Sequence, residues 1–175
     1  MARRKKGSII LRTQVTTSGT SYVSDTIDIS ALVDVPKGEC LLIKRAWISF
    51  ADDSTHNAPL GSNLSGPSED SAVTGMATAL THTTMQPMAN PDAIAKAYFV
   101  LANDATSDLI LYEMINLMRP QEFENGMYIA TDQIHCAADV GVALGGEIDV
   151  SFVFECETVK LSREQALDLA VSLQQ

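Results

Sequence analysis

The feature that most constrains this chain is the alternation of apolar and polar residues with a period of two. The alternation is nearly perfect at 147–157, where apolar residues alternate with mostly acidic ones, and it recurs at 8–17 and 22–29. Because successive side chains of a strand point to opposite faces, this pattern indicates antiparallel strands with one face in a core and the other in water. We therefore predict an all-β domain.

The segment 40–50 is the clearest strand of the chain. Its alternation defines two faces: one carries Ile43, Arg45, Trp47 and Ser49, and the other carries Leu42, Lys44, Ala46, Ile48 and Phe50. Two further short strands are expected at 123–130 and 131–138. The segment 94–101 fits a strand, although Pro91 and the residues after it also fit one helical turn.

The middle of the chain is less regular. Residues 51–75 are rich in Asp, Ser, Asn, Gly and Pro and have almost no periodicity, so they predict a long loop inserted between strands. The threonines of 76–88 favour a strand, but Pro87 limits its length. The segment 108–118 is largely apolar and fits a strand or a short helix equally well.

The last residues have a different pattern. Ser162–Gln165 is a capping box flanked by apolar residues placed for a hydrophobic staple, which is typical of a helix start. Ala166, Leu169, Ala170 and Leu173 then mark one helical face. This C-terminal helix (161–175) either packs back on its own domain or bridges to a neighbouring subunit, where Leu169 and Leu173 are the candidate contacts.

Charge divides the chain into two parts. Arg3, Arg4, Lys5 and Lys6 form a basic arm (1–7), and the rest of the chain holds 8 basic and 22 acidic residues. A protein that binds nucleic acid over its whole surface needs a broad basic field, so that class is excluded. The arm alone can contact phosphates or anionic headgroups, or it can serve only as a solubilising tail.

The three cysteines, Cys40, Cys136 and Cys156, have neither the number nor the spacing of a disulfide framework or a C-x-x-C motif. Each lies among apolar or strand-like neighbours, so we expect buried thiols that behave as small hydrophobic groups. Three free thiols are typical of a reducing compartment.

Catalytic and metal-binding patterns are sparse. His56, His82 and His135 have no histidine partner at ligand spacing, and the chain contains no phosphate-binding glycine loop, dinucleotide fingerprint or Gly-x-Ser-x-Gly motif. We therefore expect no enzyme, no metal and no cofactor. The segment after the arm has only three consecutive apolar residues, too few for a secretory signal, which predicts synthesis in the cytoplasm.

About eight short strands with turn signals between them predict a β-sandwich over 8–160. A short basic arm leading into eight antiparallel strands, with the long 51–75 insertion, resembles the single jelly-roll capsid proteins of icosahedral viruses. The resemblance covers most of the chain and rests on architecture. It implies an eight-stranded antiparallel jelly-roll β-sandwich with one long loop and a C-terminal helix, and it places Trp47, Phe152 and Phe154 in the core.

The resemblance also implies a function. The protein would be a capsid subunit of the virion that self-assembles with copies of itself, and with other capsid proteins where a shell has more than one. The arm would contact the packaged nucleic acid. Four charges neutralise little of a genome, so an anionic membrane vesicle, as in viruses built from vertical single jelly rolls, is the other expected contact.

A different class of protein also fits the strands. A β-sandwich that binds a ligand or receptor, such as a spike or appendage domain, would use the 51–75 loop as its binding surface. Sugar binding of that kind needs clustered exposed aromatic side chains, and the chain has 1 Trp, 4 Tyr and 5 Phe, mostly within strand patterns.

Overall fold

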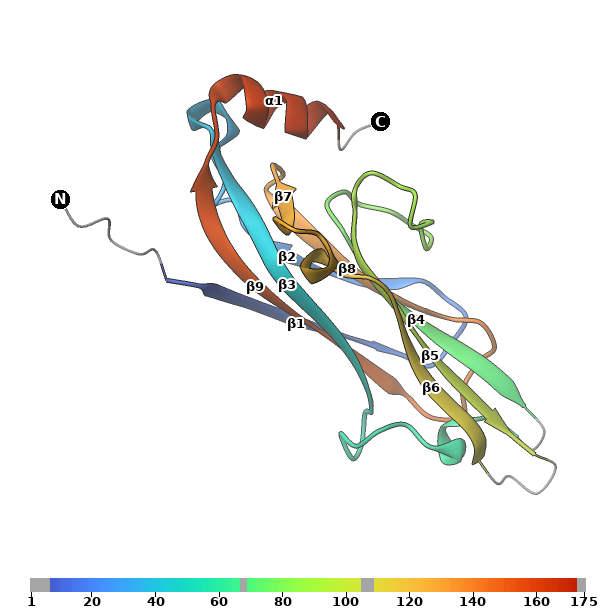
Figure 1. The fold of residues 1–175 in the computed structure, drawn as a ribbon. Helices are drawn as coiled ribbons and strands as arrows, with labels where there is room; N and C mark the ends of the chain where they lie inside the picture. The colour runs from blue at the N-terminus through green and yellow to red at the C-terminus, as the bar shows by residue number, and fades with distance from the viewer. Residues whose placement is uncertain (1–6, 67–68, 105–108, 173–175) are drawn as a thin grey trace.

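A computed structural model describes residues 7–66, 69–104 and 109–172, although not the side chains of 109 and 110. Within these residues the chain forms nine strands, three short 3₁₀ turns and one helix (Figure 1). The strands are β1 (Ile9–Thr17), β2 (Val23–Asp28), β3 (Glu39–Asp52), β4 (Asp70–Thr78), β5 (Ala93–Asn103), β6 (Leu109–Met118), β7 (Met127–Ile129), β8 (Gln133–Val140) and β9 (Ile148–Lys160). The 3₁₀ turns are η1 (Val35–Lys37), η2 (Gly61–Asn63) and η3 (Pro120–Glu122), and the helix is α1 (Arg163–Ser172).

The strands form two antiparallel sheets that pack face to face. Sheet A has the order β1-β9-β3-β7, and sheet B has the order β2-β8-β4-β5-β6. This interleaving of early and late strands in both sheets is the topology of a jelly roll, with β6 added at one edge of sheet B. The predicted jelly-roll sandwich is confirmed, with nine strands in place of eight.

Apolar side chains from both sheets fill the space between them. Phe152 and Phe154 of β9 are fully buried, as predicted. Gly75 marks a close approach of the two sheets, since a Cβ there would lie 2.8 Å from Val150 and 2.9 Å from Ile48. The absence of a side chain at this position lets the sheets pack at this distance.

The prediction that Trp47 belongs to the core is wrong, because 43% of its surface is exposed. It lies on the outer face of sheet A, the face it shares with Arg45 and Ser49. A β-bulge between Ile43 and Arg45 inserts one extra residue, Lys44, into the strand. The bulge explains why the predicted faces of β3 match only beyond this point: Ile43 is buried although Arg45 is exposed.

The predicted 51–75 loop is shorter than expected, because β3 continues to Asp52 and β4 begins at Asp70. The connection between β3 and β4 is held to the end of β3 by hydrogen bonds. Asp52 accepts hydrogen bonds from Ser54, Thr55 and the side-chain amide of Asn63. These bonds hold the pKa of the Asp52 carboxyl well below its ordinary value. The ambiguous segments at 94–101 and 108–118 are both strands, β5 and β6.

The helix α1 packs back on its own domain. Its predicted capping box is present: the Ser162 hydroxyl accepts from the backbone N–H of Gln165, and the side-chain oxygen of Gln165 accepts from the backbone N–H of Ser162. Ala166 is fully buried in a small cluster with Cys40 and Ala130, and Leu169 packs against that cluster. Figure 1 shows α1 lying across the end of the sandwich near β7, at the end opposite the β3–β4 connection.

Candidate assembly and binding surfaces

Sheet A carries the attachment point of the basic arm. Arg3, Arg4, Lys5 and Lys6 lie outside the described residues, but the chain they begin enters the fold at β1, the edge strand of sheet A. The Ser8 hydroxyl donates to Glu155 Oε1 of β9 at 3.1 Å, which fixes the chain directly before β1. The chain directly after the arm is therefore fixed at the edge of sheet A.

The outer face of sheet A next to the arm carries basic and aromatic side chains. Lys44 Nζ lies 2.7 Å from Glu157, and Arg45 lies 3.6 Å from Glu155, so these two cations are paired with carboxylates of β9. Trp47 lies opposite Val153 in the neighbouring strand and presents its exposed ring on the same face. This face is less acidic than the chain as a whole and offers an apolar surface beside the arm.

The sequence left open whether the C-terminal helix packs on its own domain or bridges to a neighbouring subunit, and the structure shows it packed on its own domain. Leu169 is half-buried against the domain's own apolar cluster, whereas Leu167 and Val171, on the opposite side of α1, are exposed. Leu173 lies outside the described residues. A contact between Leu169 and another subunit stays a prediction, and the exposed apolar side chains of the helix are ones that the sequence analysis did not select.

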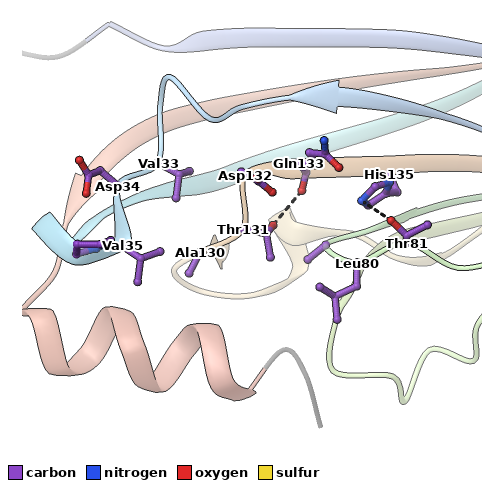
Figure 2. A pocket seen from close by; sticks show the side chains of 12 residues that line it. Val33, Asp34, Val35, Leu80, Thr81, Ala130, Thr131, Asp132, Gln133 and His135 are labelled. Atoms are coloured by element: carbon purple, nitrogen blue, oxygen red, sulfur yellow. Dashed lines mark hydrogen bonds between the residues drawn. The ribbon is translucent and has the colours of Figure 1, made fainter.

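A cleft of about 590 Å³ lies between η1, the start of β8 and the residues that follow β4 (Figure 2). His135 lies at one end of this cleft, where its ring nitrogens contact the hydroxyls of Thr26 at 3.2 Å and Thr81 at 3.1 Å. Burial lowers the pKa of His135, and the nearby His82 lowers it further. Both ring nitrogens are thus occupied by hydroxyl groups of the fold.

The other histidines each have a carboxylate partner. His82 Nε2 lies 2.7 Å from Asp92, which is buried and also accepts from the Leu80 nitrogen. His56 lies 3.5 Å from Asp149 at the other end of β9. Within the described part of the chain, no three histidine, cysteine or acidic side chains lie close enough together to hold a metal ion.

The three cysteines are buried with free thiols, as predicted. Burial raises the pKa of Cys40 and Cys136, and it raises the pKa of Cys156 to about 12. Since the thiolate is the reactive form, these thiols are poor nucleophiles at neutral pH. They pack as small apolar groups.

The sequence analysis missed an apolar edge on sheet B. Leu111, Tyr112 and Met114 of β6 are all exposed, from both faces of the strand. The apolar run at 108–118 was the available signal, but the sequence could not show that this segment lies at the edge of a sheet. Phe123, after η3, adds a further exposed aromatic side chain.

A scan against protein-family models finds no match, and a search of curated proteins finds no similar sequence. Among the described residues no helix has the length and apolar character needed to cross a membrane.

Proposed function

We propose that this protein is a structural subunit of a virus capsid, which assembles with copies of itself into a shell around the genome or an internal membrane vesicle. The observation that carries the proposal is the jelly-roll strand order, β1-β9-β3-β7 against β2-β8-β4-β5-β6, entered by a basic arm at β1. Capsid proteins are one of the main groups of proteins built on this fold.

The charges of the chain fit such a role. The arm concentrates four cations beside sheet A, while the remaining chain is strongly acidic. In a shell, this arrangement turns the arm toward phosphates of a genome or of lipid headgroups. The acidic remainder keeps assembled particles apart in solution.

Enzymes that share the jelly roll place their metal-binding side chains inside the sandwich. Metal-dependent enzymes of the cupin type hold their metal with histidines inside the sandwich. In this chain His135 lies on the outer side of sheet B, since its neighbour Cys136 points into the core. The inner faces of the sheets carry mainly apolar side chains instead.

A ligand-binding module would use the long connection after β3 as its surface. Residues 53–69 contain no aromatic residue, so this loop offers no ring on which a sugar can stack. Its Asn63 is buried, and the Asn63 amide is bonded to Asp52, which leaves little of its polar chemistry for a ligand. The loop supports a structural role.

Electron microscopy of the purified full chain tests the proposal. We expect closed shells of uniform diameter, and copurifying nucleic acid or lipid, measured by absorbance and phosphorus content, identifies the contents. A variant with Arg3, Arg4, Lys5 and Lys6 replaced by Gln is the matched control for the contents, which should be lost. Dispersed single subunits over the whole range of salt and protein concentration would overturn the proposal.

A further inference from the structure

The strand β6 ends sheet B and has one neighbour, β5. Apart from its pairing with β5, no backbone hydrogen bond of residues 109–118 is found within the described structure. The N–H and C=O groups along its other side are therefore available. Such an edge is a template that a further strand can extend.

The core-side face of β6 is also uncovered. Tyr112 and Met114 lie opposite Leu101 and Phe99 of β5, whose side chains point into the core and are buried. Tyr112 itself is 62% exposed and Met114 is 40% exposed. The corresponding edge of sheet A is β7, which has three residues and is too short to cover a ten-residue strand.

The edge strands on the other side of the sandwich are more polar than β6. β1 exposes Arg12 and Gln14, and β2 exposes Asp25 and Asp28. Charged side chains at an edge discourage a further strand from adding to it. β1 and β6 each contain one charged residue, Arg12 and Glu113, and they differ in their exposed large apolar side chains, which are Ile10 in β1 and Leu111, Tyr112 and Met114 in β6.

We propose that β6 of one copy pairs with β6 of a second copy, antiparallel and about a two-fold axis, so that sheet B continues across the interface. This inference rests on the proposed function, because it names one contact by which the shell assembles. The partner segment must be extended, because only an extended backbone can form main-chain hydrogen bonds along the open edge of a sheet. A two-fold axis makes the contact closed and self-complementary, since each copy supplies the same strand.

Low charge together with exposed apolar side chains favours β6 as the place where a second copy binds. Two copies repel each other, because beyond the arm each holds 22 acidic and 8 basic residues. Contact is least opposed where charge is lowest. Along β6 the single carboxylate is the only charge to be accommodated.

The same carboxylate excludes one register. A two-fold axis at Glu113 would place two carboxylates directly opposite, which is destabilising. An axis at Met114 places Glu113 opposite Ile115 and Tyr112 opposite Asn116 of the second copy. Axes at Tyr112 or Ile115 also separate the two carboxylates; we place the axis at Met114, whose side chain then faces its own counterpart, and a cross-link at this residue tests that choice.

Cross-linking tests this register. The variant Met114→Cys places two thiols on directly opposed residues, about 4.5–5.5 Å apart between Cβ atoms, and the native cysteines are buried. Oxidation with diamide should convert most of the protein to a covalent dimer, seen on a non-reducing gel. Ile10→Cys, at an exposed apolar position of β1, is the matched control and should stay monomeric on the gel.

A second variant tests the interface itself. Met114→Lys should weaken association by at least about 30-fold, measured by sedimentation velocity, with an unchanged circular dichroism melt. Ile10→Lys should assemble as the wild-type protein does. The cross-linking experiment keeps the inference testable if Met114→Lys fails to fold.

The outcomes separate the two proposals. Wild-type shells, together with unaltered assembly of Met114→Lys and no dimer from Met114→Cys, would overturn the β6 contact and leave the capsid function standing. A wild-type protein that never associates would overturn the capsid function. Dimers from Met114→Cys with loss of assembly in Met114→Lys support both.

Discussion

The two long edge strands of the sandwich, β1 and β6, differ in how regularly they pair and in which side chains they expose. β1 pairs with β9 over nine residues without a shift of register, and it turns polar side chains such as Arg12 and Gln14 to the solvent. β6 pairs with β5 through two irregularities and exposes Leu111, Tyr112 and Met114. The two edges carry the same number of charged residues, one each, and differ in pairing regularity and in the number of exposed apolar side chains.

The outer faces of the two sheets differ as well. Sheet A leaves Trp47 exposed beside the arm, whereas the residues between β4 and β5 cover part of sheet B and bury His135. Under the proposals above, the arm before β1 binds an anionic partner and β6 binds a second copy of the chain. The following changes test this division.

The largest expected effect is on stability at the β1 side. Phe154 is fully buried and lies opposite Leu11 of β1 in the pairing of β9. Phe154→Ala should lower the free energy of unfolding by about 3–5 kcal/mol, measured by urea denaturation. Tyr112→Ala on β6 should change it by less than about 0.5 kcal/mol in the monomer. Equal losses would show that β6 belongs to the domain's own core.

The second change concerns the arm. Replacement of Arg3, Arg4, Lys5 and Lys6 by Gln should weaken binding to anionic lipid vesicles by about 1 kcal/mol for each charge. Vesicle sedimentation measures this loss, and the binding of the wild-type chain should fall steeply with added salt. The matched control is Lys37→Gln, a single exposed cation of η1. Unchanged vesicle and nucleic-acid binding would show that the arm is only a solubilising tail.

The third change tests whether the two sheets pack as one unit. Gly75→Val places a side chain against Val150 and Ile48, where there is no room for a Cβ. It should lower the free energy of unfolding by about 1–3 kcal/mol, measured by urea denaturation. Gly141→Ala is the control, since its nearest neighbour would lie 3.8 Å away. A neutral Gly75→Val would contradict the close packing of β4 on sheet A.

The smallest expected effect is a pH dependence on sheet B. Burial holds the pKa of His135 below its ordinary value, so the folded state resists protonation while the unfolded chain takes up a proton near pH 6.5. Stability is therefore complete above that pH and falls as the pH decreases through the folded pKa. Asp92 and Asp132 oppose this effect, and His82 adds to it.

His135→Gln should reduce the fall in melting temperature between pH 7 and pH 5. His56→Asn is the control, because its side chain is exposed and asparagine tolerates the positive φ of 56° at that position. If the pH dependence is the same in His135→Gln and in the wild type, another group is responsible.

The sequence predicts most of the fold because strands with one face in the core and one face in solvent alternate apolar and polar residues. It fails at the start of β4, because the buried positions there include Ser71 and Gly75, so the alternation in burial gives no apolar and polar alternation in the sequence. It fails at Trp47 because the resemblance to jelly-roll capsid proteins was carried over to this residue as a core position. The face that Trp47 shares with Arg45 and Ser49 was the better guide.

The candidate surfaces could be predicted only in part. The basic arm is visible as a run of charge, and the α1 capping box is visible as a motif. The open edge at β6 depends on strand order, which long-range pairing decides and local periodicity cannot show. The same apolar run would have been ordinary core had another strand lain beside it.

The most direct test is size exclusion coupled to light scattering on the full chain and on Met114→Lys, near neutral pH and at moderate salt. We expect the wild-type chain to give a megadalton species, or a discrete oligomer that grows into one, and Met114→Lys to remain near 18.8 kDa. A wild-type chain that elutes as an 18.8 kDa monomer at high concentration would contradict assembly through this open edge.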